Sequence, residues 1–354
     1  MQAANGPAAG PVESARELWS PAGPYLNTAS YGLPPKPGWD ALQAALDEWR
    51  AGHTSWEGWA ASTEAARRSW ACLVGVAPER VAIGSVVSSL VGLVAASAPD
   101  GARVLMPDVD FTSLQWPWLV HSDRRLEVES VPVARLAEAI DSRTYAVAFS
   151  AVQSATGEVA DLDSISTAAK HHDALTMVDG TQACGWLALD HMHFDAVACG
   201  AYKWLMSPRG SAFMAVSPRL MECLRPVAAN WFAGEDVHDS YYGLPLRLAE
   251  SARRFDTSPA WFSWVGTAPA LEVIEGIGIA NIHDHDVALA NSFRAGLQLP
   301  PSNSAIVSAE VAGAADKLDA AGIKAAVRAG SLRASFHVYN TQADVDAALN
   351  ALEL

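Results

Sequence analysis

Cysteine is scarce in this sequence and does not cluster. The four cysteines, Cys72, Cys184, Cys199 and Cys223, include no Cys-x-x-Cys pair, so the spacing fits neither a disulfide framework nor a zinc site. Buried, reduced thiols are the expected state. The stretch 283–286 (HDHD) contains metal-capable groups, but alternating histidines point in different directions, and we interpret it as a solvated face. No metal site is predicted.

Basic residues are also in short supply, with 24 Lys and Arg against 39 Asp and Glu and a net charge of −15. A broad basic surface for nucleic acid is therefore excluded, and binding to anionic lipid is disfavoured. No apolar run reaches the roughly 18 residues of a membrane span, and the first residues lack the basic start and apolar core of a signal peptide. We expect a cytoplasmic protein with no nucleic-acid or membrane partner.

The most regular feature is the alternation of short β-type runs with helical segments. The predicted strands are 80–83, 103–106, 145–149, 175–178, 195–199 and 212–216, and helices such as 88–98 and 163–171 lie between them. This order is typical of βα units and predicts an α/β fold with a mostly parallel central sheet. A long helical stretch is expected over 39–74.

The sequence outside this alternating region predicts a leader and a second, smaller domain. Residues 1–20 are rich in Ala, Gly and Pro and are expected to form a flexible leader. Residues 51–240 are predicted to form the large domain and 241–354 a smaller α+β domain. In the latter, strands are expected at 305–310, 325–328 and 332–336, with helices at 314–321 and 343–352.

Three polar positions follow predicted strands, at the edge of the sheet where such folds bind ligands. Asp179 ends one strand, Lys203 follows the next between aromatic residues, and Ser85 lies in a Gly-Ser turn before a helix. Taken singly, these residues also fit a helix cap, a surface lysine and an N-cap. Their order along the chain favours a shared cofactor site, because pyridoxal phosphate (PLP) is held by a lysine, a carboxylate at the ring nitrogen and a phosphate-binding turn.

The sequence resembles the class V aminotransferase family of fold-type I PLP enzymes, which includes cysteine desulfurases, kynureninases and isopenicillin-N-epimerase-like proteins. The motifs that carry the resemblance are YLNTASYGLPP at 25–35, SATGEVADL at 154–162, VDGTQACG at 178–185, AYKWLMSPRG at 201–210, RRFDTSP at 253–259 and LRASFHVYNTQADVD at 332–346. The resemblance implies the fold-type I architecture. It also implies that residues 21–50 line the site and pack on the small domain.

The resemblance also implies roles around the cofactor ring. Lys203 is expected to form the Schiff base with PLP and to move the proton at the substrate α-carbon, while Asp179 keeps the ring nitrogen protonated. Gln182 and Ser154 are expected near the ring hydroxyl. Phe111 is expected to stack on the ring.

At the phosphate, the resemblance implies contacts from Ser85, the backbone at Val86 and the Tyr202 hydroxyl. A further hydroxyl, from Ser258, is expected to come from the neighbouring subunit. This implies a homodimer with the site at its interface.

On the substrate side, the resemblance assigns the α-carboxylate to Arg333 and places Asn27, Ser30 and Trp231 near the substrate. Desulfurases carry a nucleophilic cysteine on a loop just before the matching arginine, and residues 328–332 of this chain contain none. We therefore predict an enzyme acting at the α-carbon of an amino acid, an aminotransferase first and not a cysteine desulfurase. A C–S β-lyase, an epimerase and a non-catalytic ligand-binding protein of the same fold are the alternatives.

Overall fold

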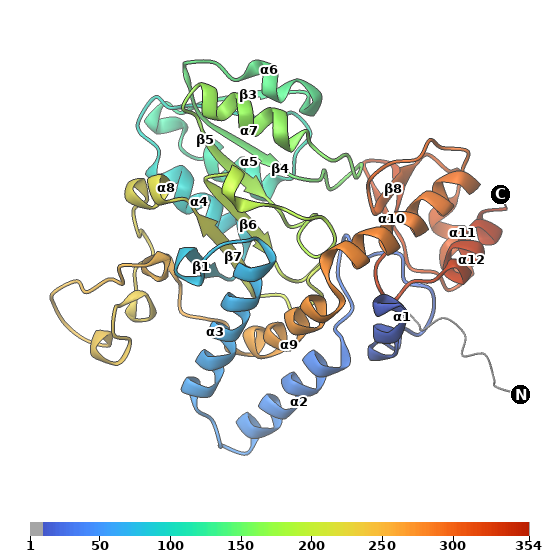
Figure 1. Cartoon of the computed structure of the whole chain (residues 1–354), viewed down its shortest axis with the longest axis horizontal. Helices are drawn as coiled ribbons and strands as arrows, with labels where there is room; N and C mark the ends of the chain where they lie inside the picture. The colour runs from blue at the N-terminus through green and yellow to red at the C-terminus, as the bar shows by residue number, and fades with distance from the viewer. Residues whose placement is uncertain (1–9, 354) are drawn as a thin grey trace, which may run out of the picture.

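The main body of the protein is built on one sheet (Figure 1). A computed structural model describes residues 10–353, and within them seven strands pair in the order β1-β7-β6-β5-β4-β2-β3. The strands are β1 (Val81–Gly84), β2 (Arg103–Pro107), β3 (Glu127–Val131), β4 (Thr144–Ser150), β5 (Leu175–Asp179), β6 (Ala196–Gly200) and β7 (Ala212–Val216). In this described sheet β7 is the strand of reversed direction, antiparallel to both β1 and β6, and the other pairs are parallel. The predicted α/β fold with a mostly parallel sheet is confirmed.

Continuous apolar runs explain the central strands, because a strand covered on both faces has no polar side. All residues of β1, β6 and β7 are buried. The edge strand β3 reads EVESV and is mostly exposed. Its alternating charges protect a free edge, and they are also the reason why the sequence pattern did not predict it.

Helices cover both faces of the sheet. One face carries α4 (Val87–Ser97), α5 (Thr112–Leu119) and α8 (Pro218–Cys223); the other carries α3 (Trp56–Leu73), α6 (Leu136–Ala139), α7 (Leu162–His171) and α9 (Trp261–Ile277). Each face has its own apolar core. The sheet is thus buried between two layers, as its sequence requires.

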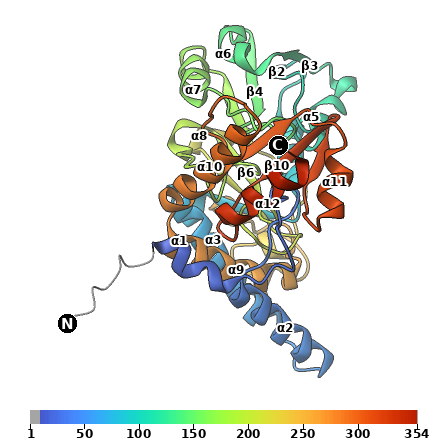
Figure 2. The ribbon, with the colours of Figure 1, turned by 90° about the vertical axis from the view of Figure 1, so that its right-hand side faces the viewer.

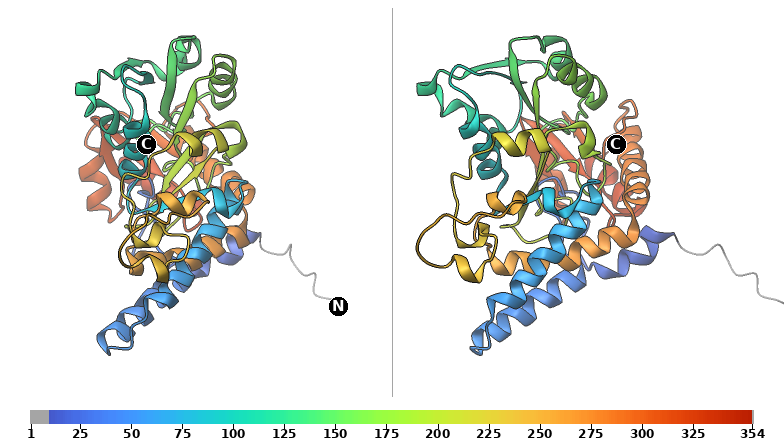
Figure 3. Two further views of the ribbon diagram at one scale, coloured as in Figure 1. Left: turned by 90° about the vertical axis from the view of Figure 1, so that its left-hand side faces the viewer. Right: turned by 60° about the vertical axis from the view of Figure 1, so that its left-hand side comes forward.

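The helical stretch expected over 39–74 is two helices, which corrects that prediction. The first, α2 (Lys36–Arg50), ends before Gly52, which has the left-handed backbone (φ +76°) that commonly stops a helix. The second, α3, starts at Trp56. Both pack against α9, and Figure 3 shows the three gathered at one end of the molecule.

The C-terminal part forms a separate three-stranded antiparallel sheet within the described residues, in the order β8-β10-β9. It consists of β8 (Ile306–Ala309), β9 (Ala326–Arg328) and β10 (Ser331–Ser335), with α10 (Ile279–Gly296), α11 (Ala314–Ala320) and α12 (Gln342–Leu352) around it (Figure 2). These helices and strands share an apolar core.

The described part of the leader differs from the loose segment expected for 1–20. Residues 1–9 lie outside the described residues, but Pro11–Ala15 forms α1, and Val12 and Trp19 are buried. Over the described chain, no single helix meets the length and apolarity of a membrane span, although α9 and α10, bent by 82° at their junction, meet them jointly.

Candidate active site

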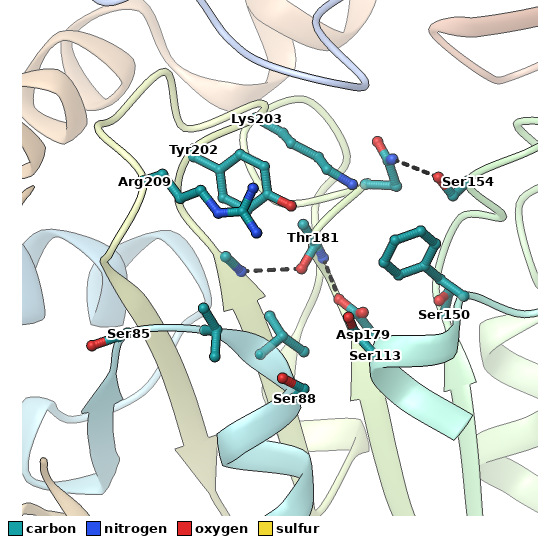
Figure 4. A pocket seen from close by; sticks show the side chains of 15 residues that line it. Ser85, Ser88, Ser113, Ser150, Ser154, Asp179, Thr181, Tyr202, Lys203 and Arg209 are labelled. Carbon is teal, nitrogen blue, oxygen red and sulfur yellow. Dashed lines mark hydrogen bonds between the residues drawn. The ribbon is translucent and has the colours of Figure 1, made fainter. Parts of the chain in front are cut away.

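A pocket lies at the carboxyl ends of β1, β2, β4, β5 and β6, where the loops that follow these strands meet at one edge of the sheet (Figure 4). It encloses about 650 Å³ of space that atoms do not fill, including part of its open mouth. The lining residues are Ser85, Val86, Val87, Ser88, Phe111, Ser113, Ser150, Ser154, Asp179, Thr181, Gln182, Gly200, Tyr202, Lys203 and Arg209. Eight of the predicted site residues are among them.

Asp179 is buried at the end of β5, and burial raises the pKa of its carboxyl. The backbone N–H of Thr181 donates to its Oδ1 (2.8 Å), and the Thr181 hydroxyl in turn accepts from the Gly200 N–H (3.0 Å). This chain of bonds ties the ends of β5 and β6 together. These bonds orient the Asp179 carboxylate toward the cavity, and because the donors are neutral they leave its charge in place.

Lys203 follows β6 and is 7% exposed. Burial lowers the pKa of its amine to about 8, against an attraction from Asp179 that raises it. Nζ lies 5.5 Å from the ring centroid of Phe111 and 5.7 Å from that of Tyr202. The amine is therefore enclosed by two aromatic rings and one carboxylate.

The N-terminal segment closes on the lysine loop. The Gly32 N–H donates to the Tyr202 carbonyl (3.0 Å), and a Cβ at Gly32 would stand 2.0 Å from the Lys203 carbonyl oxygen. Only glycine permits that approach.

The opposite end of the cavity is suited to an anion. Helix α4 begins here, and its N-cap residue Val86 makes no side-chain cap, so the first N–H groups of the helix face the cavity without that partner. Ser85 and Ser88 add hydroxyls, and the Arg209 guanidinium lies 5.1 Å from the Tyr202 ring centroid. Figure 4 shows Arg209 and Tyr202 together on the side of the cavity that faces Ser85.

Ser154 links the ring end of the cavity to the substrate side. Its hydroxyl accepts from Gln182 Nε2 (3.0 Å) and from Arg333 Nη1 (3.2 Å), and its carbonyl accepts from the same Nη1 (2.6 Å). Arg333 Nη2 donates to the Ser30 hydroxyl (2.8 Å). Arg333 is buried, its Nε has no partner in the described structure, and burial together with Arg328 lowers its pKa to about 10.

Five predicted residues are not among those that line the cavity of this chain. Arg333 and Ser30 lie at its rim, where Arg333 donates to the lining residue Ser154; the other three lie farther away. Ser258 is exposed, although its neighbour Thr257 bonds to the carbonyl of Ile83, two residues before Ser85. Trp231 stacks edge-on against Trp56 at 5.2 Å in an aromatic cluster. Asn27, which forms a β-bridge with Ser335, also lies outside the lining.

Several lining residues were not predicted from the sequence, notably Thr181, Arg209, Ser88, Ser113 and Ser150. Thr181 and Arg209 lie inside motifs already singled out, two residues after Asp179 and six after Lys203. Their place in those motifs was the available signal. The three serines carry no pattern that distinguishes them from caps and turns.

The HDHD stretch also departs from its expected role. Asp286 is fully buried and bonds to His337 Nδ1 (2.9 Å), while His337 Nε2 lies 3.0 Å from the Trp204 carbonyl. The stretch is therefore partly core rather than a solvated face. Over residues 10–353, no group of three or more His, Cys, Asp or Glu side chains is placed to hold a metal ion.

The cavity offers the groups that PLP needs. An enclosed amine and a buried carboxylate lie at one end, and a helix N-terminus with hydroxyls and a guanidinium lies at the other. Gly200 lies between these two ends, and a Cβ there would stand 3.3–3.6 Å from the side chains of Tyr202, Val87 and Thr181.

Comparison with known proteins agrees with this arrangement. The family model "Aminotransferase class-V" matches residues 53–316. The chain is 29% identical to the uncharacterized aminotransferase YcbU of Bacillus subtilis, over 88% of this chain and 89% of that protein. It is 28% identical to isopenicillin N epimerase of Amycolatopsis lactamdurans, over 81% and 83%. Its fold is similar to that of the cysteine desulfurase CsdA of Escherichia coli, with a TM-score of 0.84 over 98% of both chains at 21% identity.

The family match spans the strands and loops that build the cavity, from β1 to β7. The chain belongs to the class V aminotransferase family, and it is a pyridoxal-phosphate-dependent enzyme that acts on amino acids.

Proposed function

We propose that the protein is an aminotransferase in which Lys203, Asp179 and Arg333 form the reaction centre. The observation that carries this proposal is the placement of an enclosed amine of lowered pKa, a buried carboxylate and a buried guanidinium around one cavity and its rim. When bound there, PLP supplies an electron-withdrawing ring that weakens the bonds at the α-carbon of an amino acid.

Lys203 is proposed to hold the cofactor covalently and then to move the α-carbon proton. A neutral amine is needed for both tasks, and burial favours the neutral form. Asp179 is proposed to hold a proton on the ring nitrogen, which requires that the carboxyl stay in the cavity as Thr181 fixes it.

Arg333 is proposed to bind the substrate carboxylate. Its guanidinium now donates only to neutral oxygens of Ser30 and Ser154, and a carboxylate is the stronger, bidentate partner. Gln182 and Ser154 would then position the ring hydroxyl from the same side. Phe111 would cover the ring face, since its side chain already lies over the lysine amine.

We also propose that the enzyme is not a cysteine desulfurase. The residues between Arg328 and Arg333 form a tight hairpin with Ala329 and Gly330 at its turn, so the segment has neither a cysteine nor the length of a mobile loop. No cysteine is among the cavity-lining residues in the described chain. Cys184 and Cys199 are buried, while Cys72 and Cys223 lie elsewhere on the surface.

A homodimer with a shared site is part of the proposal. Ser258 is exposed beside the turn that carries Ser85, and the nearby loop exposes Tyr242, Leu244 and Leu246 to 89%, 93% and 74%. A second copy of the chain would cover these apolar side chains and would bring Ser258 to the partner's cavity.

Epimerisation is the second candidate, because the sequence similarity to an isopenicillin N epimerase extends over most of both chains. Both reactions begin with loss of the α-carbon proton, so the same residues would serve. A C–S β-lyase reaction shares that first step and differs in its leaving group.

The test is to incubate the PLP-loaded enzyme with a panel of L-amino acids and 2-oxo acids and to identify the products. Amino transfer predicts a new amino acid formed from the 2-oxo acid. Racemised substrate would favour epimerisation, and pyruvate with ammonia from an S-substituted cysteine would favour the lyase. A protein that retains no PLP during loading and reacts with none of these substrates would contradict the proposal and support a ligand-binding protein.

A further inference from the structure

Two guanidinium groups meet at one oxygen atom beside the active-site cavity. Arg333 Nη2 donates to the Ser30 hydroxyl at 2.8 Å, and Arg328 Nη2 donates to the same hydroxyl at 3.2 Å. The hydroxyl therefore accepts from two cations at once. Both nitrogens lie within 3.2 Å of that oxygen, so a small anion can reach both groups.

The β9–β10 hairpin sets this geometry. Arg328 pairs with Ser331, and Arg333 lies two residues beyond Ser331 on the same strand, so both arginines project from the same face of the hairpin. Ala329 and Gly330 join the strands with φ of 49° and 83°, as in a tight two-residue turn. The short turn holds Arg328 close to Arg333.

The charge of Arg328 has no carboxylate to balance it. Its other hydrogen bond goes to the Val327 carbonyl, and no salt bridge to Arg209, Arg328 or Arg333 is found in residues 10–353. The chain as a whole carries 15 more negative than positive charges. Arg209 at the cavity and Arg328 and Arg333 at its rim therefore form a group of cations without a carboxylate partner among the described residues, and such a group attracts anions.

The proposed function uses two of these three cations. Arg209 lies at the phosphate end and Arg333 is assigned to the substrate carboxylate, which leaves Arg328 in excess. A role for Arg328 in fixing the N-terminal segment is not needed, because the Ser30 backbone is already held by a hydrogen bond from its N–H to the Asn27 carbonyl (2.9 Å). An exposed arginine gains little from a neutral hydroxyl alone.

We propose that Arg328 is a specificity-determining residue that binds a second anionic group, so that the substrate is an α-amino acid with an acidic side chain. This inference rests on the proposed function, in which Arg333 binds the α-carboxylate. Because the two guanidinium groups share the Ser30 hydroxyl, the two anionic groups of the substrate are separated by a short chain, as in aspartate or glutamate.

Binding of unreactive acids tests the inference without turnover. Glutarate has two carboxylates and pentanoate has one on a chain of the same length, and both are titrated calorimetrically into the PLP-loaded enzyme. We expect glutarate to bind about tenfold to a hundredfold more tightly, the effect of one charge-assisted hydrogen-bonded pair. In Arg328→Gln the ratio should fall at least about tenfold, and Arg328→Lys should retain part of it.

Arg135→Gln is the matched control, because Arg135 is an exposed arginine paired with Glu138 on a distant part of the surface. It should leave the ratio unchanged, and the thermal unfolding of all variants reports whether they fold. Equal binding of glutarate and pentanoate to the unaltered enzyme would overturn the inference. So would a ratio that a folded Arg328→Gln variant preserves.

Reactive substrates separate this inference from the proposed function. L-glutamate, L-glutamine and O-phospho-L-serine are mixed with the enzyme, and the change in cofactor absorbance is followed. Selectivity for glutamate over glutamine supports the inference, and the rank of phosphoserine shows whether the second group is a carboxylate or a phosphate. An equal response to glutamate and glutamine contradicts the inference alone, whereas no response to any amino acid contradicts the proposed function.

Discussion

The amine of Lys203 is influenced in opposite directions by its surroundings. Burial lowers its pKa, Asp179 raises it, and the cations of Arg333 and Arg328 lower it further. The result is a pKa of about 8, well below the ordinary 10.5 of a lysine. About a tenth of the amine is then neutral at pH 7, far more than for a lysine of ordinary pKa, and the neutral amine is the nucleophile.

The pH dependence of cofactor capture follows from this pKa. When PLP is added to the cofactor-free enzyme, the rate of its covalent attachment should rise with pH, with a midpoint near 8, because the reactive neutral form of Lys203 appears as pH passes the pKa. Stopped-flow absorbance measures the rate. In Asp179→Asn the midpoint should move down by about one pH unit, since an attracting charge is lost. A midpoint near 10.5 would contradict the account of Lys203.

Arg333 gives a prediction about substrate binding. Arg333→Lys keeps the charge but loses the planar pair of donors, so kcat/KM should fall by about tenfold to a hundredfold. The absorbance of bound cofactor should stay the same, because Arg333 contacts Ser30 and Ser154 rather than the lining lysine. An unchanged kcat/KM with a saturating cofactor band would remove Arg333 from the substrate site.

The sequence motifs identified residues at both ends of the cavity, but they did not predict the hydrogen bonds that connect its parts. Lys203, Asp179 and Ser85 follow strands, and strand ends of one direction meet at one edge, so their proximity was predictable. The convergence of Ser30, Ser154 and Arg333 was not predictable from the residues alone. These residues lie on three segments far apart in sequence, and their contacts depend on how the N-terminal segment crosses the small sheet.

A buried ion pair holds one loop of the site. Arg67 of α3 donates to Asp256 Oδ2 (2.6 Å), just after the 3-10 helix η8 (Ala252–Phe255), and Asp256 Oδ1 accepts from the Ile83 N–H (2.8 Å). Burial raises the pKa of Asp256 to about 6, while attraction to Asp256 and Glu64 outweighs burial and raises the pKa of Arg67. Both groups are therefore charged at pH 7, and the pair fixes the segment leading to Ser258 against β1.

Breaking this pair should destabilise the fold. Asp256→Asn leaves the Arg67 charge buried without its counter-ion, and the free energy of unfolding should fall by about 3–5 kcal/mol. Urea denaturation measures it. The double variant Arg67→Met with Asp256→Leu should recover much of the loss, because it leaves no uncompensated charge. If Asp256→Asn is as stable as the unaltered protein, the pair is not a structural anchor.

Helices and strands were predictable from the sequence where a single signal, such as an apolar run or a capping motif, is strong. Buried strands show as apolar runs, and α12 shows the Thr341 capping box at its start. The edge strand β3 and the break between α2 and α3 were missed, because a charged edge strand lacks the apolar run and one glycine is a weak stop signal within an Ala- and Trp-rich stretch.

The proposed shared site requires two copies of the chain. Sedimentation should give a mass close to twice the 37.4 kDa of one chain, since a stable interface must cover the exposed side chains of Leu244 and Leu246. The double variant Leu244→Asp and Leu246→Asp should weaken association and cofactor retention together. A monomer at micromolar concentration that still binds PLP fully would exclude the shared site.

The attachment of PLP to Lys203 can be tested by the visible absorption spectrum of the purified protein after incubation with PLP, compared with that of Lys203→Ala. We expect a protein-bound cofactor band that survives gel filtration and changes when an amino acid is added. After borohydride reduction, mass spectrometry should find a covalent PLP adduct in the unaltered protein and none in Lys203→Ala. Thermal unfolding confirms that the variant is folded. A protein that binds no PLP, or binds it covalently at another lysine, would contradict the account.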